Sequence, residues 1–149
     1  MIGGAAAGTA GGAAYAIAMA ADLRLFRYRA DDYLLLGGAF GFRPAGAALA
    51  GRGIHIVNSA LLGVVFERIA YRQLPFPAPV NGIVFASVEN AVLYPVLIGE
   101  RFHPLIKSGD LPSYLHPVPF AQSVVRHVAY GAVCGWAVDR LLKRSGIRA

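Results

Sequence analysis

Residues 2–21 form a run of twenty residues without a charged side chain, and this run limits most strongly what the chain can fold into. As an α-helix, which rises about 1.5 Å per residue, the run spans about 30 Å, the thickness of the hydrocarbon core of a bilayer. It differs from a secretory signal because it lacks a positively charged start and its glycines are spread along its whole length. We therefore expect a retained transmembrane helix over about residues 2–22.

The composition of the chain also favours a membrane protein. Of its 149 residues, 56% are hydrophobic and 15% are charged, whereas soluble domains carry about 25% charged residues. The net charge of +6 could suggest nucleic-acid binding, but the basic residues form no continuous run and no aromatic-plus-basic motif accompanies them. They lie at the edges of apolar segments, where Lys and Arg reach lipid headgroups. We therefore expect the lipid bilayer, and not nucleic acid, as a partner.

Three further apolar segments follow the first, at about residues 53–71, 80–99 and 121–142. Together the four segments predict an all-α bundle of four transmembrane helices in a single domain, residues 1–149. The uncharged part of the second segment is short, so this segment crosses a bilayer only if its flanking charges sit at the interfaces or if its helix starts near Pro44. Residues 30–52 are apolar but broken by glycines, and they predict an interfacial or re-entrant segment between the first two helices.

The pattern His-x3-[Ser/Gly]-x3-Gly-x3-[Asp/Glu]-Arg occurs twice, starting at His55 and, seventy-two residues later, at His127. Steps of four residues keep these positions on one face of a helix. The two copies predict an ancient duplication of a two-helix unit. Small residues on such faces let helices approach closely in lipid, which favours packing into a homo-oligomer or against subunits of a larger membrane complex. The residues concerned are Gly4, Gly8 and Gly12 in the first apolar segment, and Ser59, Gly63, Gly131 and Gly135 in the two copies of the motif. We call these rows the small-residue stripes.

Glu89 lies near the centre of the third apolar segment, with Asn90 beside it. An ionisable group there costs at least about 2.5 kcal/mol, so we expect Glu89 to face the interior of the bundle, either paired or protonated. His127 could approach it from the fourth helix. One interpretation is a proton or cation pathway in which Glu89 carries the charge. The other is a protonated carboxyl group hydrogen-bonded to a neighbouring helix.

His55 and His127 are predicted to lie on the same side of the bilayer, near the starts of two parallel helices. Their ring nitrogens could hydrogen-bond across helices. Alternatively, the two imidazoles could hold one metal ion or one haem iron between them, because neutral imidazole is a common ligand. Neither helix carries a second histidine and the chain has no covalent haem motif. We therefore expect no cofactor and keep haem as an alternative.

The chain has no nucleophile elbow, phosphate loop or His-Glu-x-x-His motif, so the sequence does not predict an enzyme. The leading hypothesis is a multi-pass membrane protein that acts as a packing or structural subunit. The first alternative is a small transporter of protons, ions or solutes that uses Glu89, His55 and His127. The second is a haem-binding membrane electron carrier ligated by the two histidines.

Two features resemble the small uncharacterised bacterial inner-membrane proteins of the YagU type: the glycine stripe of the first helix, and the helices in which His is followed by small residues at four-residue steps (His55, Ser59, Gly63; His127, Gly131, Gly135). The resemblance covers the architecture across most of the chain, with agreement of motifs confined to these stripes. It implies a multi-pass protein of the bacterial plasma (inner) membrane without an established activity. It carries over no catalytic residue.

Overall fold

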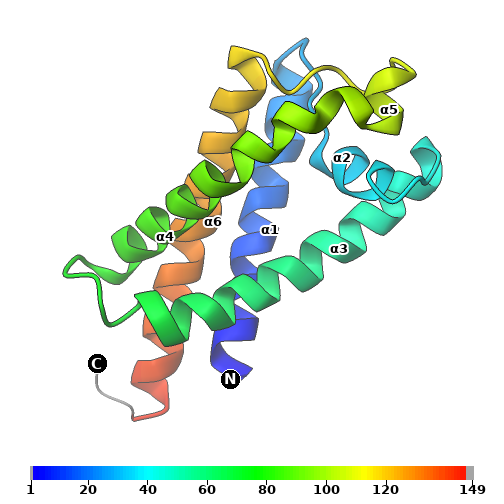
Figure 1. The fold of residues 1–149 in the computed structure, drawn as a ribbon. Helices are drawn as coiled ribbons and strands as arrows, with labels where there is room; N and C mark the ends of the chain where they lie inside the picture. Colours follow the sequence, from blue (N-terminus) through cyan, green and yellow to red (C-terminus); the bar gives the residue numbers. More distant parts are fainter. Residues whose placement is uncertain (1, 147–149) are drawn as a thin grey trace.

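The computed structural model of the protein describes residues 2–146, and within them all regular secondary structure is helical. This confirms the predicted all-α class. Figure 1 shows four long helical segments and two short helices, α2 (Asp32–Gly38) and α5 (Pro104–Lys107). The long segments are α1 (Ile2–Leu25), α3 (Pro44–Val65) with a π-helical turn at Phe66–Ala70, α4 (Ala78–Leu93) with a 3-10 helix at Tyr94–Phe102, and α6 (Pro117–Arg144).

Two of the long segments, Pro44–Ala70 and Ala78–Phe102, are long and apolar enough to cross a membrane. In each segment, the most apolar stretch of 18 residues is mostly exposed: only 22% of it is buried in the first segment and 17% in the second. The two segments therefore do not resemble the core helices of a soluble domain. α1 is rich in Gly and Ala, and α6 carries several polar side chains in its first half. In the described part of the chain, length and composition therefore mark two candidate spans rather than the four predicted.

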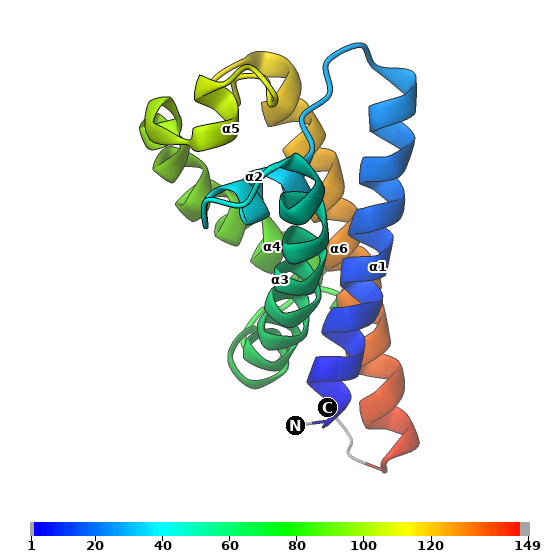
Figure 2. The same ribbon diagram turned by 90° about the vertical axis from the view of Figure 1, so that its right-hand side faces the viewer.

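The four long segments form two layers (Figures 1 and 2). α1 and α6 pack against each other in one layer, while α3 and α4 cross them obliquely in the other, α3 on α1 and α4 on α6. Successive long segments run in opposite directions. The start of α1, the end of α6 and the connection from α3 to α4 therefore lie at one end, with α2 and α5 near the other (Figure 1).

The two helix pairs, α1 with α3 and α4 with α6, cross at equivalent positions. A Cβ atom on Gly8 of α1 would meet the carbonyl oxygen of Ser59 on α3, and a Cβ atom on Gly82 of α4 would meet the carbonyl oxygen of Gly131 on α6. Ser59 and Gly131 occupy the same place in the two copies of the sequence motif. Each copy thus packs against the preceding long helix in the same register, as a duplicated two-helix unit would.

The other small residues of the stripes also lie at helix crossings inside the chain. Gly4 faces the backbone of Gly63, Gly12 faces the side chain of Ser59, and Gly135 faces the backbone of α4 at Ala78. The stripes therefore hold together the helices of one molecule. Their use in a homo-oligomer or a larger complex stays a prediction.

The second long helix begins at Pro44, the earlier of the two starts that the sequence allowed, and not at residue 53. Proline is favoured in the first turn of a helix, where its missing N–H would have had no partner. The predicted segment 30–52 is accordingly divided between α2 and the first part of α3. Gly41 lies between them with φ of +81°, a conformation that favours glycine. The other predicted ranges, 2–22, 80–99 and 121–142, each lie within a longer helical segment.

Candidate functional site

Arg126, in the first half of α6, is the centre of a buried network of ion pairs. Arg126 is only 1% exposed to solvent. The guanidinium donates to both carboxylate oxygens of Asp22 at 2.6 and 2.7 Å, to Asp32 at 2.5 Å and to the carbonyl oxygen of Ala30 at 3.0 Å. Bidentate pairing of this kind is among the stronger and more directional interactions available to arginine. The network joins α6 to the end of α1 and to the start of α2.

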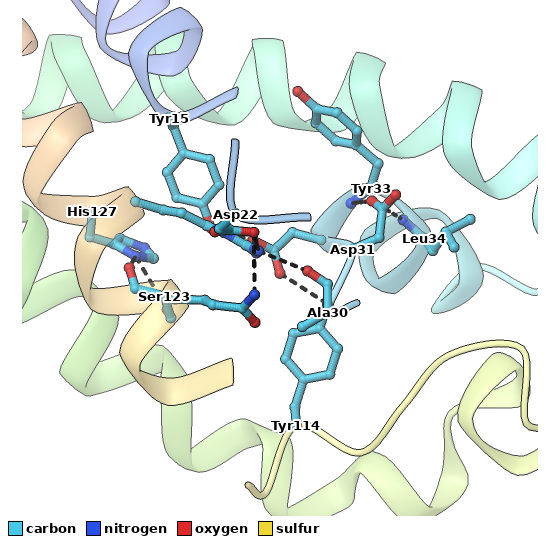
Figure 3. Close-up of polar contacts among 12 residues, drawn as sticks. Tyr15, Asp22, Ala30, Asp31, Tyr33, Leu34, Tyr114, Ser123 and His127 are labelled. Atoms are coloured by element: carbon cyan, nitrogen blue, oxygen red, sulfur yellow. Dashed lines mark hydrogen bonds and ion pairs between the residues drawn. The ribbon is translucent and has the colours of Figure 1, made fainter. Parts of the chain in front are cut away.

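Two tyrosines approach this network from two sides (Figure 3). Tyr15 of α1 donates its hydroxyl to Oδ2 of Asp32 at 2.6 Å, and Tyr114, which precedes α6, donates to Oδ1 at 3.0 Å. Burial, together with the negative charge of Asp32, holds the pKa of Tyr114 well above its usual range, so Tyr114 keeps its proton and acts as a donor. Asp32 therefore accepts hydrogen bonds from one guanidinium and two hydroxyl groups, as an ionised carboxylate can.

Glu89 of α4 and His127 of α6 form a second polar contact. Oε2 of Glu89 lies 3.0 Å from Nε2 of His127, and both side chains are 16% exposed. Nδ1 of the same ring lies 2.7 Å from the carbonyl oxygen of Ser123 and carries a proton there, because a carbonyl can only accept. One more proton must lie between Nε2 and Oε2, on the imidazole or on the carboxyl group. The pair is neutral in both arrangements and becomes negative when that proton leaves.

Asn90 is connected to the same contact through Ser123. The hydroxyl of Ser123 donates to Oδ1 of Asn90 at 2.7 Å and lies 3.3 Å from Nδ1 of His127. These contacts join α4 and α6 next to Glu89. The amide, the hydroxyl and the carboxylate–imidazole pair thus form one continuous polar strip along the two helices.

A pocket of about 210 Å³ lies between α3 and α4. The Arg126 network contributes Asp32 to its wall, and the second polar contact contributes Glu89 and His127. Its remaining surface is formed largely by tyrosine and leucine side chains. The structure brings all four predicted site residues into this one wall. The polar lining includes Asp32, His55, Asn58, Glu89, Asn90, Ser123 and His127.

His55 contributes to the pocket from α3, where its Nε2 lies 3.1 Å from the carbonyl oxygen of Gly12. The ring of Tyr15 contacts both imidazoles, with centroids 4.9 Å from His55 and 5.2 Å from His127. Ligation of one haem or metal ion by both histidines would need a free nitrogen on each ring, and both nitrogens of His127 already have partners in the chain. Within residues 2–146, no group of three or more His, Cys, Asp or Glu could hold a metal ion. The donor set therefore does not fit the predicted haem or metal alternative.

The network of Asp22, Asp32 and Arg126 was not predicted from the sequence. The signal that could have revealed it is Arg126 itself, which lies inside an apolar segment next to His127. An arginine in such a place requires an acidic partner, because an unpaired buried charge is costly. The sequence contains that requirement but does not say which of its acidic residues meets it.

Comparison of the chain with protein-family models, curated proteins and solved structures gives no match. The resemblance to the YagU type rests on the glycine stripes and stays a prediction. A function for this protein has to rest on the geometry and chemistry of the pocket.

Proposed function

We propose that this protein spans a membrane with four helices, moves a small solute across it, and exchanges a proton at Glu89 and His127 during transport. The observation that carries the proposal is the 3.0 Å contact between these two side chains in the wall of a pocket between α3 and α4. Carboxylate–imidazole pairs hold and release protons readily, since histidine titrates near neutral pH in its unperturbed state.

A bilayer would account for the outer surface of the bundle. Soluble proteins rarely expose large continuous apolar surfaces, whereas lipid-facing helices do so along their whole length. α1 and α6 contain 24 and 28 residues, and about 20 suffice to cross the hydrocarbon core. The bacterial plasma membrane is the location that the YagU-type resemblance implies. The large apolar side chains exposed on α3 and α4 include Leu49, Ile56, Val57, Leu61, Val88 and Val92.

The polar pocket favours a transporter over a purely structural subunit. Ionisable groups at membrane depth are expensive, and they mark substrate pathways and proton relays in membrane proteins. A bundle that served only to pack against neighbours would gain nothing from Glu89 and His127 at an open cavity. The small-residue stripes, which suggested a packing role, are used for contacts within the chain.

The Glu89–His127 pair also suggests how a proton and a solute would be coupled. Loss of the shared proton changes the charge of the pocket wall by one unit. In surroundings of low dielectric constant, one unit of charge shifts the binding of a nearby charged group strongly. Binding of a charged solute would therefore favour one protonation state of the pair, and release of the solute would favour the other.

Replacing Glu89 by glutamine should reduce proton movement to the rate of protein-free liposomes. Glutamine has nearly the same volume but cannot exchange a proton. The measurement uses liposomes that contain a pH-sensitive dye, with the membrane potential clamped. Cholinium, 3,3-dimethylbutan-1-ol or 3,3-dimethylbutyrate is added to them; these solutes have similar shapes and are cationic, neutral and anionic, respectively. We expect the wild type to move protons in response to at least one of these solutes.

Glu67→Gln is the matched control, because Glu67 lies in the π-helical turn after α3 and does not line the pocket. This variant should behave like the wild type. A Glu89→Gln variant that still responds at the wild-type rate would contradict the proposal. So would a wild type that responds to none of the three solutes.

A further inference from the structure

We infer that the solute is a small organic cation, recognised by the carboxylates of Asp32 and Glu89 and by the tyrosine side chains of the pocket wall. This inference rests on the proposed function, because it names the class of solute for the same pocket. It is carried by the balance of charges around the cavity, by the chemistry of its wall and by its size.

The charges around the pocket do not balance. Asp22 and Asp32 share the single guanidinium of Arg126, so two negative groups face one positive group and the network carries a net charge of −1. The pair of Glu89 and His127 is neutral while it holds its shared proton and negative after it releases that proton. With His55, the other histidine of the lining, counted as a neutral imidazole, the pocket is therefore negative in both protonation states of the pair.

No lysine or arginine in the described part of the chain lines this pocket. Arg126 lies behind Asp32, and Arg52 lies over the ring of Tyr33 at 5.7 Å, beside a separate pocket. Glu100, which is bound to the backbone N–H of Tyr114, adds further negative charge near the cavity. An uncompensated negative charge in apolar surroundings is costly, so a cationic solute would be stabilised where a neutral or anionic one would not.

The wall suits an organic cation better than a metal ion. Tyr94, which is partly exposed, lines the pocket with the more deeply buried Tyr15 and Tyr114 and with leucine side chains, and aromatic rings attract ammonium groups. A bare ion such as Ca²⁺ needs six or more converging oxygen ligands, and within residues 2–146 no three acidic, histidine or cysteine side chains gather to supply them.

The size of the pocket is compatible with a small organic cation. A cavity of about 150 Å³ holds one benzene molecule, and the volume here is about 210 Å³. The pocket is therefore large enough for a cation slightly larger than benzene. A quaternary ammonium group with a short side chain fits this volume and would present methyl groups to the tyrosine and leucine wall.

Isothermal titration of the protein in lipid nanodiscs, with empty nanodiscs as the baseline, tests this inference. Cholinium, 3,3-dimethylbutan-1-ol and 3,3-dimethylbutyrate have similar shapes and differ in charge. We expect cholinium to bind at least about tenfold more tightly than either of the other two, as one unit of charge in a partly buried site requires. Equal affinities, a preference for the anion, or no binding of cholinium would overturn the inference.

The variant Asn58→Lys provides a second test of the inference, and this substitution does not disturb the core. Asn58 lines the pocket from α3 and is exposed, so a longer side chain fits there. The added positive charge should weaken cholinium binding at least about tenfold, whereas Asn58→Gln, which adds length without charge, should leave it nearly unchanged. Unchanged binding in the lysine variant would overturn the inference as well.

The failure of this inference can be told apart from the failure of the proposed function. Proton movement that depends on Glu89 and is driven only by the alcohol or the anion would refute the cation and leave proton-coupled transport standing. Selective binding of cholinium without any proton movement would refute transport and leave the cation site standing.

Discussion

Replacing Arg126 by methionine should cost about 3–5 kcal/mol of stability, because breaking a buried ion pair leaves its partner charges uncompensated. Asp22 would lose a bidentate partner, and Asp32 would keep only its two tyrosine donors. The loss should appear in the unfolding free energy measured by circular dichroism in mixed detergent micelles. Methionine is unbranched and apolar and replaces the aliphatic stem of arginine, so a loss of packing along the stem contributes little.

Arg140→Met is the control for this change. Arg140 lies on the same helix and is exposed, with its guanidinium 5.7 Å from the ring of Trp136. Its replacement should change the unfolding free energy by less than about 1 kcal/mol. If the two variants unfolded at the same denaturant concentration, the Arg126 network would not be the main tie between α6, α1 and α2.

Replacing Gly63 by leucine should destabilise the protein by about 1–3 kcal/mol or more, because the side chain has no room at the crossing of α1 and α3. Its Cβ atom would meet the carbonyl oxygen of Gly4 and the backbone of Gly8. Backbone atoms cannot rotate away as a flexible side chain can, so the two helices would have to separate. The unfolding free energy in mixed micelles measures the loss.

Gly53→Leu provides the matched comparison on the same helix. A Cβ atom at Gly53 would meet nothing within 4 Å. Leucine should therefore stabilise α3 there by somewhat less than about 1 kcal/mol, the difference in helix propensity between glycine and good helix formers. Both variants gain this propensity, so the difference between them isolates the clash. Equal stability of the two variants would show that α1 and α3 do not cross as closely as described.

The sequence predicts the helices well because long apolar runs and proline-rich breaks are local signals. The start of α3 at Pro44 is also a local signal, but the charged and glycine-rich residues that follow it favoured a later start at residue 53. The equivalence of the two helix pairs is detectable from the repeated motif. The structure adds which helix each copy packs against, which spacing within one helix cannot specify.

The candidate site is predictable in part. Glu89, His55 and His127 stand out because each is an ionisable group in an apolar segment, and such a group needs a partner. The Asp32 side of the pocket was not predicted, because Arg126 finds its partners 104 and 94 residues away in sequence. Pairing over that distance depends on how α1, α2 and α6 meet. Tyr15 and Tyr114 enter the site for the same reason.

Cysteine labelling at two adjacent positions of α3 tests most directly whether the pocket is a hydrophilic cavity within a membrane. Asn58 lines the pocket, whereas Val57, which is 59% exposed, does not. The wild type is the baseline, since its single cysteine, Cys134, is 1% exposed. The reagent is a charged, water-soluble methanethiosulfonate, applied to each variant in liposomes.

Asn58→Cys should react with the reagent, and Val57→Cys should react no faster than the wild type. The two residues lie at nearly the same depth, so only the surroundings of the thiol differ: a polar cavity in one case and lipid in the other. This difference is the result we expect for a bundle that encloses a polar pocket inside a bilayer. Equal labelling of both positions, or labelling of neither, would contradict it.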